Sequence, residues 1–211
     1  MDSQTCPICN NVSPFRLKKT NTNYFQCHNC KTLFSAPLDN DNMVGGGNEV
    51  QRNQVQNKER IERIGTLIGG IKNPKILDFG CGHGMLVNDL KQAGYDAYGF
   101  DLYNEEYSKL PERETYHVIT AIEVVEHLSK PFVEIDVIFR SLVKRGLLMV
   151  ETSFVDIAAQ EGIELEDFFY IEPSVGHSTI FSHHGLDLLM ATKGLPPLQH
   201  FNRNVRLFYK K

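Results

Sequence analysis

The chain has 211 residues, of which 41% are hydrophobic, and a formal net charge of −4 at neutral pH. This composition is that of an ordinary globular protein and excludes collagen-like, coiled-coil and wholly disordered chains. The net charge argues against a protein that holds nucleic acid mainly through its phosphates, because such proteins carry a positive field.

No run of residues approaches the roughly 18 apolar residues that a membrane-spanning helix needs. Residues 1–4 have neither the basic start nor the apolar stretch of a secretory signal. We therefore expect a cytoplasmic protein with no membrane partner. The length allows one domain of usual size together with a small appendage.

The first thirty residues contain two pairs of cysteines separated by seventeen residues: Cys6 and Cys9, then Cys27 and Cys30. Two residues between the cysteines of a pair let both thiolates point at one centre about 2.3 Å away, and two such turns complete the four-ligand shell that zinc prefers. A closed shell of four sulfurs predicts a structural zinc. Disulfides or redox chemistry are the alternatives, and they are disfavoured because a chain without a secretory signal stays where thiols are reduced.

Residues 1–40 are therefore predicted to form a zinc ribbon, with short strands at residues 24–26 and 32–34 on either side of the second cysteine turn. The segment is too small to bury a core of its own, so metal binding would supply most of its folding free energy. Its net charge of +2 is thin support for nucleic-acid contact. We prefer a lid or packing module, with nucleic acid as the alternative partner.

Residues 41–56 are rich in Asn, Gly and Gln, with three glycines at residues 45–47, and predict a flexible linker. Close approach of the glycine backbone to a ligand is the alternative. The larger domain is predicted to span residues 57–211. It begins with an amphipathic helix that packs on a sheet, because apolar residues recur at helical spacing from Asn57 onward: Ile61, Ile64, Leu67, Ile68 and Ile71.

A glycine-rich turn follows the first predicted strand of this domain. The apolar run at residues 75–79 is short enough for a buried strand, and a helical apolar face begins at Met85. A strand, a glycine loop and a helix in this order form the start of a nucleotide-binding unit. The glycines of the loop are Gly80, Gly82 and Gly84.

The spacing of these glycines and the charge beside them distinguish between two kinds of cofactor. A dinucleotide loop would read G-x-G-x-x-G, whereas Met85 directly follows the third glycine here. Asp78 at the mouth of the loop would repel a pyrophosphate, but it favours the sulfonium and ammonium of S-adenosylmethionine, directly or through water. A second strand at residues 97–100 ends in Asp101, and an acid at that place can accept both hydroxyls of a ribose.

Three ordered motifs resemble those of class I S-adenosylmethionine-dependent methyltransferases: Asp-Phe-Gly-Cys-Gly-His-Gly at residues 78–84, Gly-Phe-Asp-Leu at residues 99–102, and the run at residues 117–128. The resemblance covers about residues 57–211. It implies an α/β, Rossmann-like sheet, mostly parallel with an antiparallel last strand. It also implies that the glycines line the methionine portion, Asp101 binds the ribose and Leu102 lies beside the adenine. The full cofactor-binding set is Asp78, Gly80, Gly82, Gly84, Asp101, Leu102 and Glu123.

The rest of the domain predicts the same wound architecture. Strands at residues 117–122 and 146–150, with a helix between them that begins at Pro131, imply a parallel sheet. A long insertion follows residue 152, then a helix at about residues 184–193 and a closing pair of strands.

One departure from the family pattern concerns the third strand. Only fourteen residues separate Asp101 from Tyr116. The usual third strand and its helix must therefore be shortened or absent.

The candidates for catalysis follow from what methyl transfer requires. The protein mainly has to align the acceptor and exclude water, and a base helps when the acceptor is a hydroxyl or a carbon acid. Glu126 and His127 come just after the strand at residues 117–122, where strand ends meet ligand, and His177 belongs to the insertion. These three residues are the predicted catalytic set. Tyr170 can hydrogen-bond an acceptor, although its aromatic neighbours favour packing.

The same residues resemble a metal-binding set. Glu123-x-x-Glu126-His127 with a later His177 is similar to the pattern of small-RNA 2′-O-methyltransferases and of some quinone-pathway O-methyltransferases. That resemblance implies a divalent Mg, Mn or Zn ion at Glu123, Glu126, His127 and His177, which would hold the acceptor hydroxyl.

We therefore expect an S-adenosylmethionine-dependent methyltransferase with a structural zinc ribbon. The acidic charge and the absence of a basic stripe favour a small polar metabolite as acceptor, such as a sugar or a nucleotide sugar. One alternative is a metal-assisted RNA or nucleic-acid 2′-O-methyltransferase whose ribbon grips the substrate. Another is a zinc-ribbon binding module without catalytic activity, which would bind zinc but no cofactor.

Overall fold

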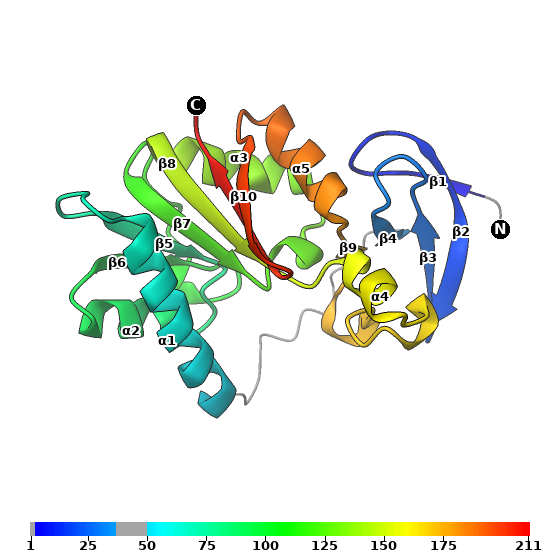
Figure 1. Ribbon diagram of the computed structural model, residues 1–211, viewed down its shortest axis with the longest axis horizontal. Helices are drawn as coiled ribbons and strands as arrows, with labels where there is room; N and C mark the ends of the chain where they lie inside the picture. Colours follow the sequence, from blue (N-terminus) through cyan, green and yellow to red (C-terminus); the bar gives the residue numbers. More distant parts are fainter. Residues whose placement is uncertain (1–2, 37–49) are drawn as a thin grey trace.

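The computed structural model describes residues 3–36 and 50–211. The larger of the two sheets in this part of the chain consists of β5 (Lys75–Phe79), β6 (Asp96–Phe100), β7 (Tyr116–Ile122), β8 (Leu142–Glu151), β10 (Pro197–Asn202) and β11 (Val205–Tyr209). Their order across the sheet is β10-β11-β8-β7-β5-β6 (Figure 1). β5 to β8 pair in parallel, whereas β11 is antiparallel to both of its neighbours. The predicted α/β, Rossmann-like fold with an antiparallel last strand is confirmed.

Helices cover both faces of this sheet. They are α1 (Val50–Leu67), α2 (Met85–Gln92), α3 (Pro131–Ser141) and α5 (His183–Thr192), whereas α4 (Val155–Glu161) lies to one side of the sheet (Figure 1). α1 and α2 share one apolar core with the sheet, to which Ile64, Leu90 and Met149 contribute. α3 and α5 pack on the opposite face. The strands from β5 to β8 are therefore covered on both sides, which is the usual condition for parallel pairing.

The first helix begins earlier than the sequence predicts. Residues 41–49 of the predicted linker lie outside the described residues, but α1 already begins at Val50, so residues 50–56 are helical. Apolar periodicity cannot detect this end of the helix, because Val50 and Val55 are the only apolar residues among residues 50–56. Polar residues such as Gln and Arg nevertheless have good helix propensity and continue the helix.

The third strand is absent, as the short connection after β6 predicts. Residues 102–115 contain a single 3₁₀ turn at Glu105–Tyr107, which leaves β6 at the edge of the sheet. Tyr107 folds back so that a Cβ at Gly84 or Gly99 would overlap its ring. The tyrosine thus packs under the glycine loop, and close packing there requires glycine.

The four cysteines lie in turns between the strands of a second sheet. Its strands are β1 (Ser3–Thr5), β2 (Val12–Lys19), β3 (Thr22–Gln26), β4 (Leu33–Ser35) and β9 (Thr179–Ile180), in that order. β9 comes from the insertion after β8 and pairs antiparallel with β4. We call residues 3–36 the four-cysteine module. Its sheet includes a strand from beyond residue 40, so it crosses the predicted boundary between residues 1–40 and the larger domain. Figure 1 shows the module and the domain with the large sheet side by side.

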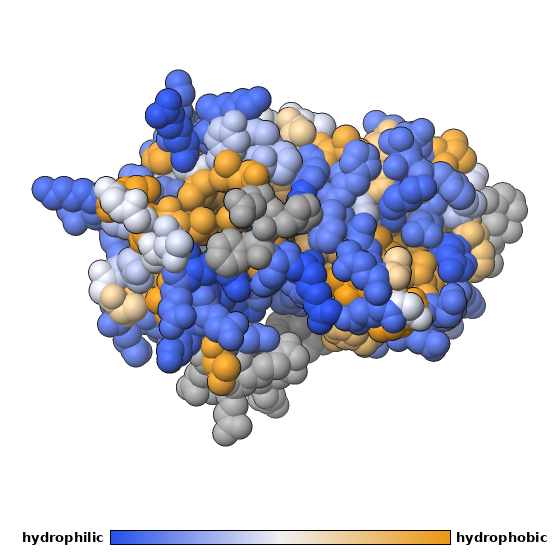
Figure 2. All heavy atoms as spheres, in the orientation of Figure 1, coloured by the Kyte–Doolittle hydropathy of each residue, from blue (hydrophilic) through white to orange (hydrophobic). Residues whose placement is uncertain are grey.

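Among the described residues no helix combines the length and the hydrophobicity that a membrane span requires. Figure 2 shows a face on which hydrophilic side chains predominate and hydrophobic ones form small groups. The cytoplasmic location stays a prediction.

Gly185 in α5 offers a test of the packing between this helix and the four-cysteine module. A Cβ at Gly185 would overlap Oγ1 of the buried Thr32. We expect Gly185→Ala to lower the free energy of unfolding by about 1–3 kcal/mol, although alanine is the better helix former. Urea denaturation measures the change as a lower midpoint at constant slope.

Gly69→Ala is the matched control, because a Cβ at Gly69 would meet its nearest neighbour at an ordinary 3.4 Å. Its effect should stay within about 0.5 kcal/mol. Equal midpoints for the two variants would contradict the packing argument.

Candidate active site

Of the three glycines in the loop that follows β5, two are covered by other side chains and one faces open space. Gly80, Gly82 and Gly84 all have positive φ angles, of 76°, 54° and 73°, which favour glycine. A Cβ at Gly80 would overlap the side chain of Val124, and Gly84 is covered by Tyr107. Nothing lies within 4 Å of the position that a Cβ at Gly82 would occupy. Of the three predicted cofactor-binding glycines, Gly82 is thus the one with open space before it.

Asp101 at the end of β6 braces this loop. Its Oδ2 accepts a 2.8 Å hydrogen bond from the amide of Gly82, and its Oδ1 accepts one of 2.8 Å from the amide of Tyr103. The side chain of Asn104 donates to the carbonyl of Gly82 at 2.7 Å. A carboxylate has about four lone-pair sites, so Asp101 can still accept hydroxyl groups. Leu102 beside it is 66% exposed and offers an apolar surface. The predicted roles of both residues stay predictions.

Asp78 differs from Asp101 in being buried, with only 5% of its surface exposed. Its Oδ1 accepts a 2.6 Å hydrogen bond from Oγ1 of Thr120 on β7. Burial raises the pKa of Asp78 to about 6, and the hydrogen bond from Thr120 and the charge of Arg60 partly oppose this rise. Asp78 therefore supplies negative charge just beneath the loop.

A buried cluster of polar groups lies beyond β7. Tyr170, from the insertion, places its hydroxyl 2.9 Å from Oε2 of Glu123, 3.0 Å from Oγ1 of Thr152 and in hydrogen-bond contact with Oε1 of Glu126. Thr152 also donates to Oε2 of Glu126 at 3.0 Å. One phenolic proton cannot satisfy two ionised carboxylates, so these contacts require a further proton on the pair.

The environment of the two carboxyl groups favours that proton. Burial raises the pKa of Glu126 to about 7, against the opposing hydrogen bonds from Tyr170 and Thr152. Burial, followed by the charge of Glu126, raises the pKa of Glu123 to about 7. Glu123 also has a φ angle of 53°, unusual for a residue with a side chain, and its amide donates to the carbonyl of Glu151 at 2.8 Å. The pair can exchange a proton near neutral pH.

The two candidate histidines lie against each other with their ring centres 4.9 Å apart. Nδ1 of His127 lies 3.2 Å from the carbonyl of Gly176, and Nδ1 of His177 lies 2.7 Å from the carbonyl of Tyr170. A carbonyl only accepts, so we assign the proton of each neutral ring to Nδ1 and the lone pair to Nε2. Burial lowers the pKa of His127 to about 4 and also lowers that of His177. Both rings therefore stay neutral at neutral pH, and Nε2 of each keeps a lone pair that can accept a hydrogen bond or bind a metal.

The structure brings the predicted catalytic residues together. One ligand atom each from Glu126, His127 and His177 lies within 4.8 Å of the others. Glu123, the fourth member of the metal set that the resemblance implies, instead contacts Tyr170. The sequence favoured packing for Tyr170 and gave no role to Thr152. Thr152 directly follows β8, and this position at the carboxyl end of a parallel strand could have marked it as a candidate for the site.

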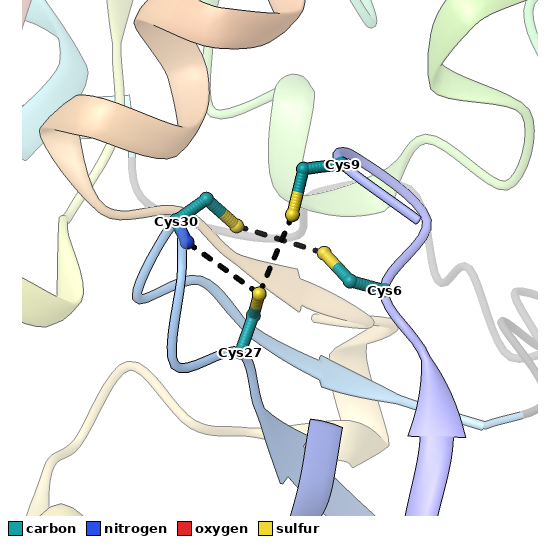
Figure 3. A group of neighbouring side chains, drawn as sticks. All are labelled: Cys6, Cys9, Cys27 and Cys30. Atoms are coloured by element: carbon teal, nitrogen blue, oxygen red, sulfur yellow. Dashed lines mark hydrogen bonds between the residues drawn. The ribbon is translucent and has the colours of Figure 1, made fainter. Parts of the chain in front are cut away.

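The four cysteines converge from two turns, as Figure 3 shows. Sγ of Cys6 lies 3.6 Å from that of Cys30, and Sγ of Cys9 lies 3.4 Å from that of Cys27. All four sulfurs lie within 4.8 Å of one another, and the thiols are free. Tetrahedral zinc with bonds of about 2.3 Å needs sulfurs about 3.8 Å apart, so the cluster fits that ion. The amide of Ile8 donates to Cys6 Sγ at 3.4 Å, which favours a thiolate.

A polar cavity of about 470 Å³ lies next to the end of β8. Arg60 and Arg63 of α1 form one wall and both bind Glu151, the last residue of β8, with shortest distances of 2.6 and 3.3 Å. A second polar cavity, of about 230 Å³, lies between the four-cysteine module and the insertion, and His177 is part of its lining.

The family model described as "Methyltransferase domain" matches residues 50–200. The ubiquinone biosynthesis O-methyltransferase of Bordetella avium is 31% identical over 98 residues, which are 36% of this chain and 41% of that protein. Its counterpart from Acinetobacter baumannii is 30% identical over 99 residues, or 36% and 42% of the two chains. The matches thus span about two fifths of the length of these curated relatives.

Solved structures extend the likeness over more of the chain. The 1,6-didemethyltoxoflavin-N1-methyltransferase of Burkholderia thailandensis, bound to 1,6-didemethyltoxoflavin and S-adenosylhomocysteine, has a TM-score of 0.59 at 11% identity and covers 93% of this chain and 99% of its own. The magnesium protoporphyrin IX methyltransferase of Synechocystis PCC 6803, bound to S-adenosylmethionine, has a TM-score of 0.51 at 14% identity, with 80% and 86% covered. At these identities the likeness concerns the fold.

The buried carboxyl pair predicts a pH dependence of stability. The raised pKa of Glu126 means that the folded protein binds this proton more tightly than the unfolded chain, whose glutamate has a pKa of 4.5. This contribution to the free energy of unfolding is fully present below about pH 4.5 and is lost as the pH rises through about 7. Glu126→Gln, which mimics the protonated acid, should therefore gain stability relative to wild type, on the order of 1–3 kcal/mol, between about pH 5 and pH 8.

Urea denaturation of both proteins at the two pH values measures this gain. The exposed Glu62→Gln is the control for loss of a surface carboxylate and should show no such gain. A constant difference between Glu126→Gln and wild type across the range would count against a protonated buried pair.

Proposed function

The chain belongs to the methyltransferase-domain family, and from that premise we propose that this S-adenosylmethionine-dependent methyltransferase acts on a small polar metabolite such as a sugar or a nucleotide sugar. The observation that carries the proposal is the convergence of His127 and His177 with the carboxyl pair, Glu123 and Glu126, beyond the carboxyl end of β7. Such a set of groups serves an acceptor that must lose a proton.

The cofactor half of the site consists of the glycine loop and Asp101. The open space before Gly82 and the brace that Asp101 forms with this loop support the binding of the methionine portion and the ribose there. Asp78 beneath the loop adds negative charge, which suits a cation. When bound, S-adenosylmethionine supplies an electrophilic methyl group with a neutral thioether as leaving group.

The acceptor half supplies alignment and a base. This half would hold an acceptor oxygen or nitrogen in line with the methyl group that the cofactor would supply. The acceptor proton passes to Nε2 of His127 or His177, because this nitrogen has the lone pair in each neutral ring. The neighbouring carboxyl pair can take up a proton in turn, because burial holds the pKa values of both groups near 7.

The size and polarity of one cavity support a small polar acceptor. The cavity of about 230 Å³ that His177 helps to line is smaller than the range of about 300–1,000 Å³ that is usual for drug-sized ligands. Amides and hydroxyls also line this cavity, and such groups suit hydroxylated ligands. The net charge of −4 disfavours a phosphate backbone.

A second candidate is a metal-assisted 2′-O-methyltransferase of RNA. The observation that favours it is the approach of Glu126, His127 and His177 to within 4.8 Å, with Nε2 on each ring able to bind a divalent ion. Against it, the carboxylate of Glu126 already accepts hydrogen bonds from Thr152 and Tyr170.

The four cysteines are proposed to hold a structural zinc. The mutual distances of the sulfurs support tetrahedral coordination, and four protein ligands leave no open position for catalysis.

Asp101→Asn tests the cofactor half. Asparagine lacks the charge and one of the acceptor oxygens, so both the hydrogen bond from the Gly82 amide and the binding of ribose hydroxyls become weaker. We therefore expect S-adenosylhomocysteine to bind at least about tenfold more weakly, as measured by calorimetry. Asp96→Asn, at the exposed opposite end of β6, should leave the affinity within about twofold. Absence of binding by zinc-loaded wild type would remove the proposal altogether.

Salt dependence separates the two kinds of acceptor. Labelled methyl transfer to pools of sugars and nucleotide sugars should change little between about 50 and 200 mM salt, whereas binding through many phosphate contacts would fall steeply, by about 10³-fold or more. Efficient labelling of RNA, with the small molecules unlabelled, would favour the second candidate instead.

A further inference from the structure

The insertion after β8 contains a stretch, residues 165–182, that carries both Tyr170 and His177. We call it the acceptor segment. Through β9 it completes the sheet of the four-cysteine module, where Leu33 faces Ile180 across the pairing of β4 with β9. The side chains beside the proposed acceptor are thus attached to the cysteine module as well as to the large sheet.

Tyr24 of the module fixes the backbone at one of these residues. Its side chain is fully buried, and its hydroxyl donates a 2.7 Å hydrogen bond to the carbonyl of His177. Nδ1 of His177 in turn donates to the carbonyl of Tyr170 at 2.7 Å. The two bonds connect the module to the orientation of the imidazole and to the backbone that presents the Tyr170 hydroxyl to Glu126.

A second connection begins at a cysteine. Oγ of Ser182 donates to the carbonyl of Cys30, and the same oxygen accepts a 2.8 Å hydrogen bond from the amide of Gly185 at the start of α5. The amide of Ser182 donates to Oγ1 of Thr32 at 3.5 Å. The turn that holds Cys30 is therefore bonded directly to the end of the acceptor segment.

Contacts at the other end of the segment repeat this pattern. Lys19 donates to the carbonyl of Phe168 at 3.1 Å, and Arg16 forms an exposed ion pair with Glu166 at 3.2 Å. The module thus holds the segment at both ends and in the middle.

The cofactor half has different supports. The amide of Gly80 donates to the carbonyl of Phe100 at 2.7 Å, and Gly82 is held by Asp101 and Asn104. These supports come from β6 and the turn after it.

We infer that the metal held by the four cysteines fixes the acceptor segment and thereby positions Tyr170 and His177, while the cofactor half of the site forms without it. Tyr24 is the positioning residue that connects the module to His177. The inference rests on the proposed function for the identity of the metal and for the role of the two residues in methyl transfer.

Hydrogen exchange of the full chain, with zinc bound and after removal by a strong chelator, tests the connection without any acceptor. We expect faster exchange across residues 165–182 after zinc removal and unchanged protection across residues 75–101. The affinity for S-adenosylhomocysteine should stay within about twofold, whereas methyl transfer is lost. Faster exchange in both regions, or in neither, would overturn the inference.

Tyr24→Phe tests the positioning role with the fold intact, because it removes one hydroxyl and keeps the buried ring. We expect unchanged zinc content and cofactor affinity, faster exchange at residues 176–180, and kcat/KM about tenfold lower, since displacement of reacting groups by about 1 Å costs up to 10²-fold. Tyr98→Phe, in a partly exposed residue of β6, is the matched control and should behave as wild type. Wild-type exchange and turnover in Tyr24→Phe would show that the hydroxyl has no positioning role.

The proposed function and the inference about the metal can fail separately. A zinc-loaded wild type that binds no S-adenosylhomocysteine, or methylates no small acceptor, refutes the proposed function, whereas the exchange measurements still report whether zinc orders the segment. Cofactor binding and turnover with exchange unaffected by zinc refute only the inference.

Discussion

The carboxyl ends of four parallel strands lie along the same side of the sheet, and the chemistry of this protein depends on that arrangement. β5 ends in the glycine loop, β6 ends beside Asp101, β7 leads to Glu123 and Glu126, and β8 leads to Thr152. Parallel strands need crossover connections, and the helices that supply them cover both faces of the sheet. Loops are thus confined to the two ends of the strands, and groups far apart in the chain gather at the carboxyl ends.

The residues that sequence reasoning placed best are those fixed by local structure. Asp101 directly follows β6, and His127 lies in the short 3₁₀ turn after β7. The apolar runs of both strands are easy to recognise, so the places of these two residues at the carboxyl ends of the strands could be predicted. Tyr170 was harder, because an aromatic cluster predicts packing as well as it predicts a hydrogen bond. Thr152 has no pattern of its own. The pairing of Thr179–Ile180 with β4 was not predictable, since a strand of two residues leaves no periodic signal and its partner lies about 145 residues away.

The acceptor half of the site is close to electrically neutral, which is the opposite of what its residue types suggest. Burial keeps a proton on the carboxyl pair and keeps protons off His127 and His177. A sulfonium close by would lower the carboxyl pKa values, because a positive charge favours the ionised form. The same electrostatics therefore connects cofactor binding with the readiness of the pair to release its proton.

The addition of β9 to β4 also has a consequence for the order of events during synthesis. All four cysteines leave the ribosome well before residues 179–180, so the metal centre can assemble while the outer edge of β4 still has unpaired amides and carbonyls. An uncovered edge strand invites pairing with other chains. The loop between β4 and β9 is long, so its closure is slow. Until it closes, β4 is an exposed edge strand of the nascent chain, and only β9 covers it.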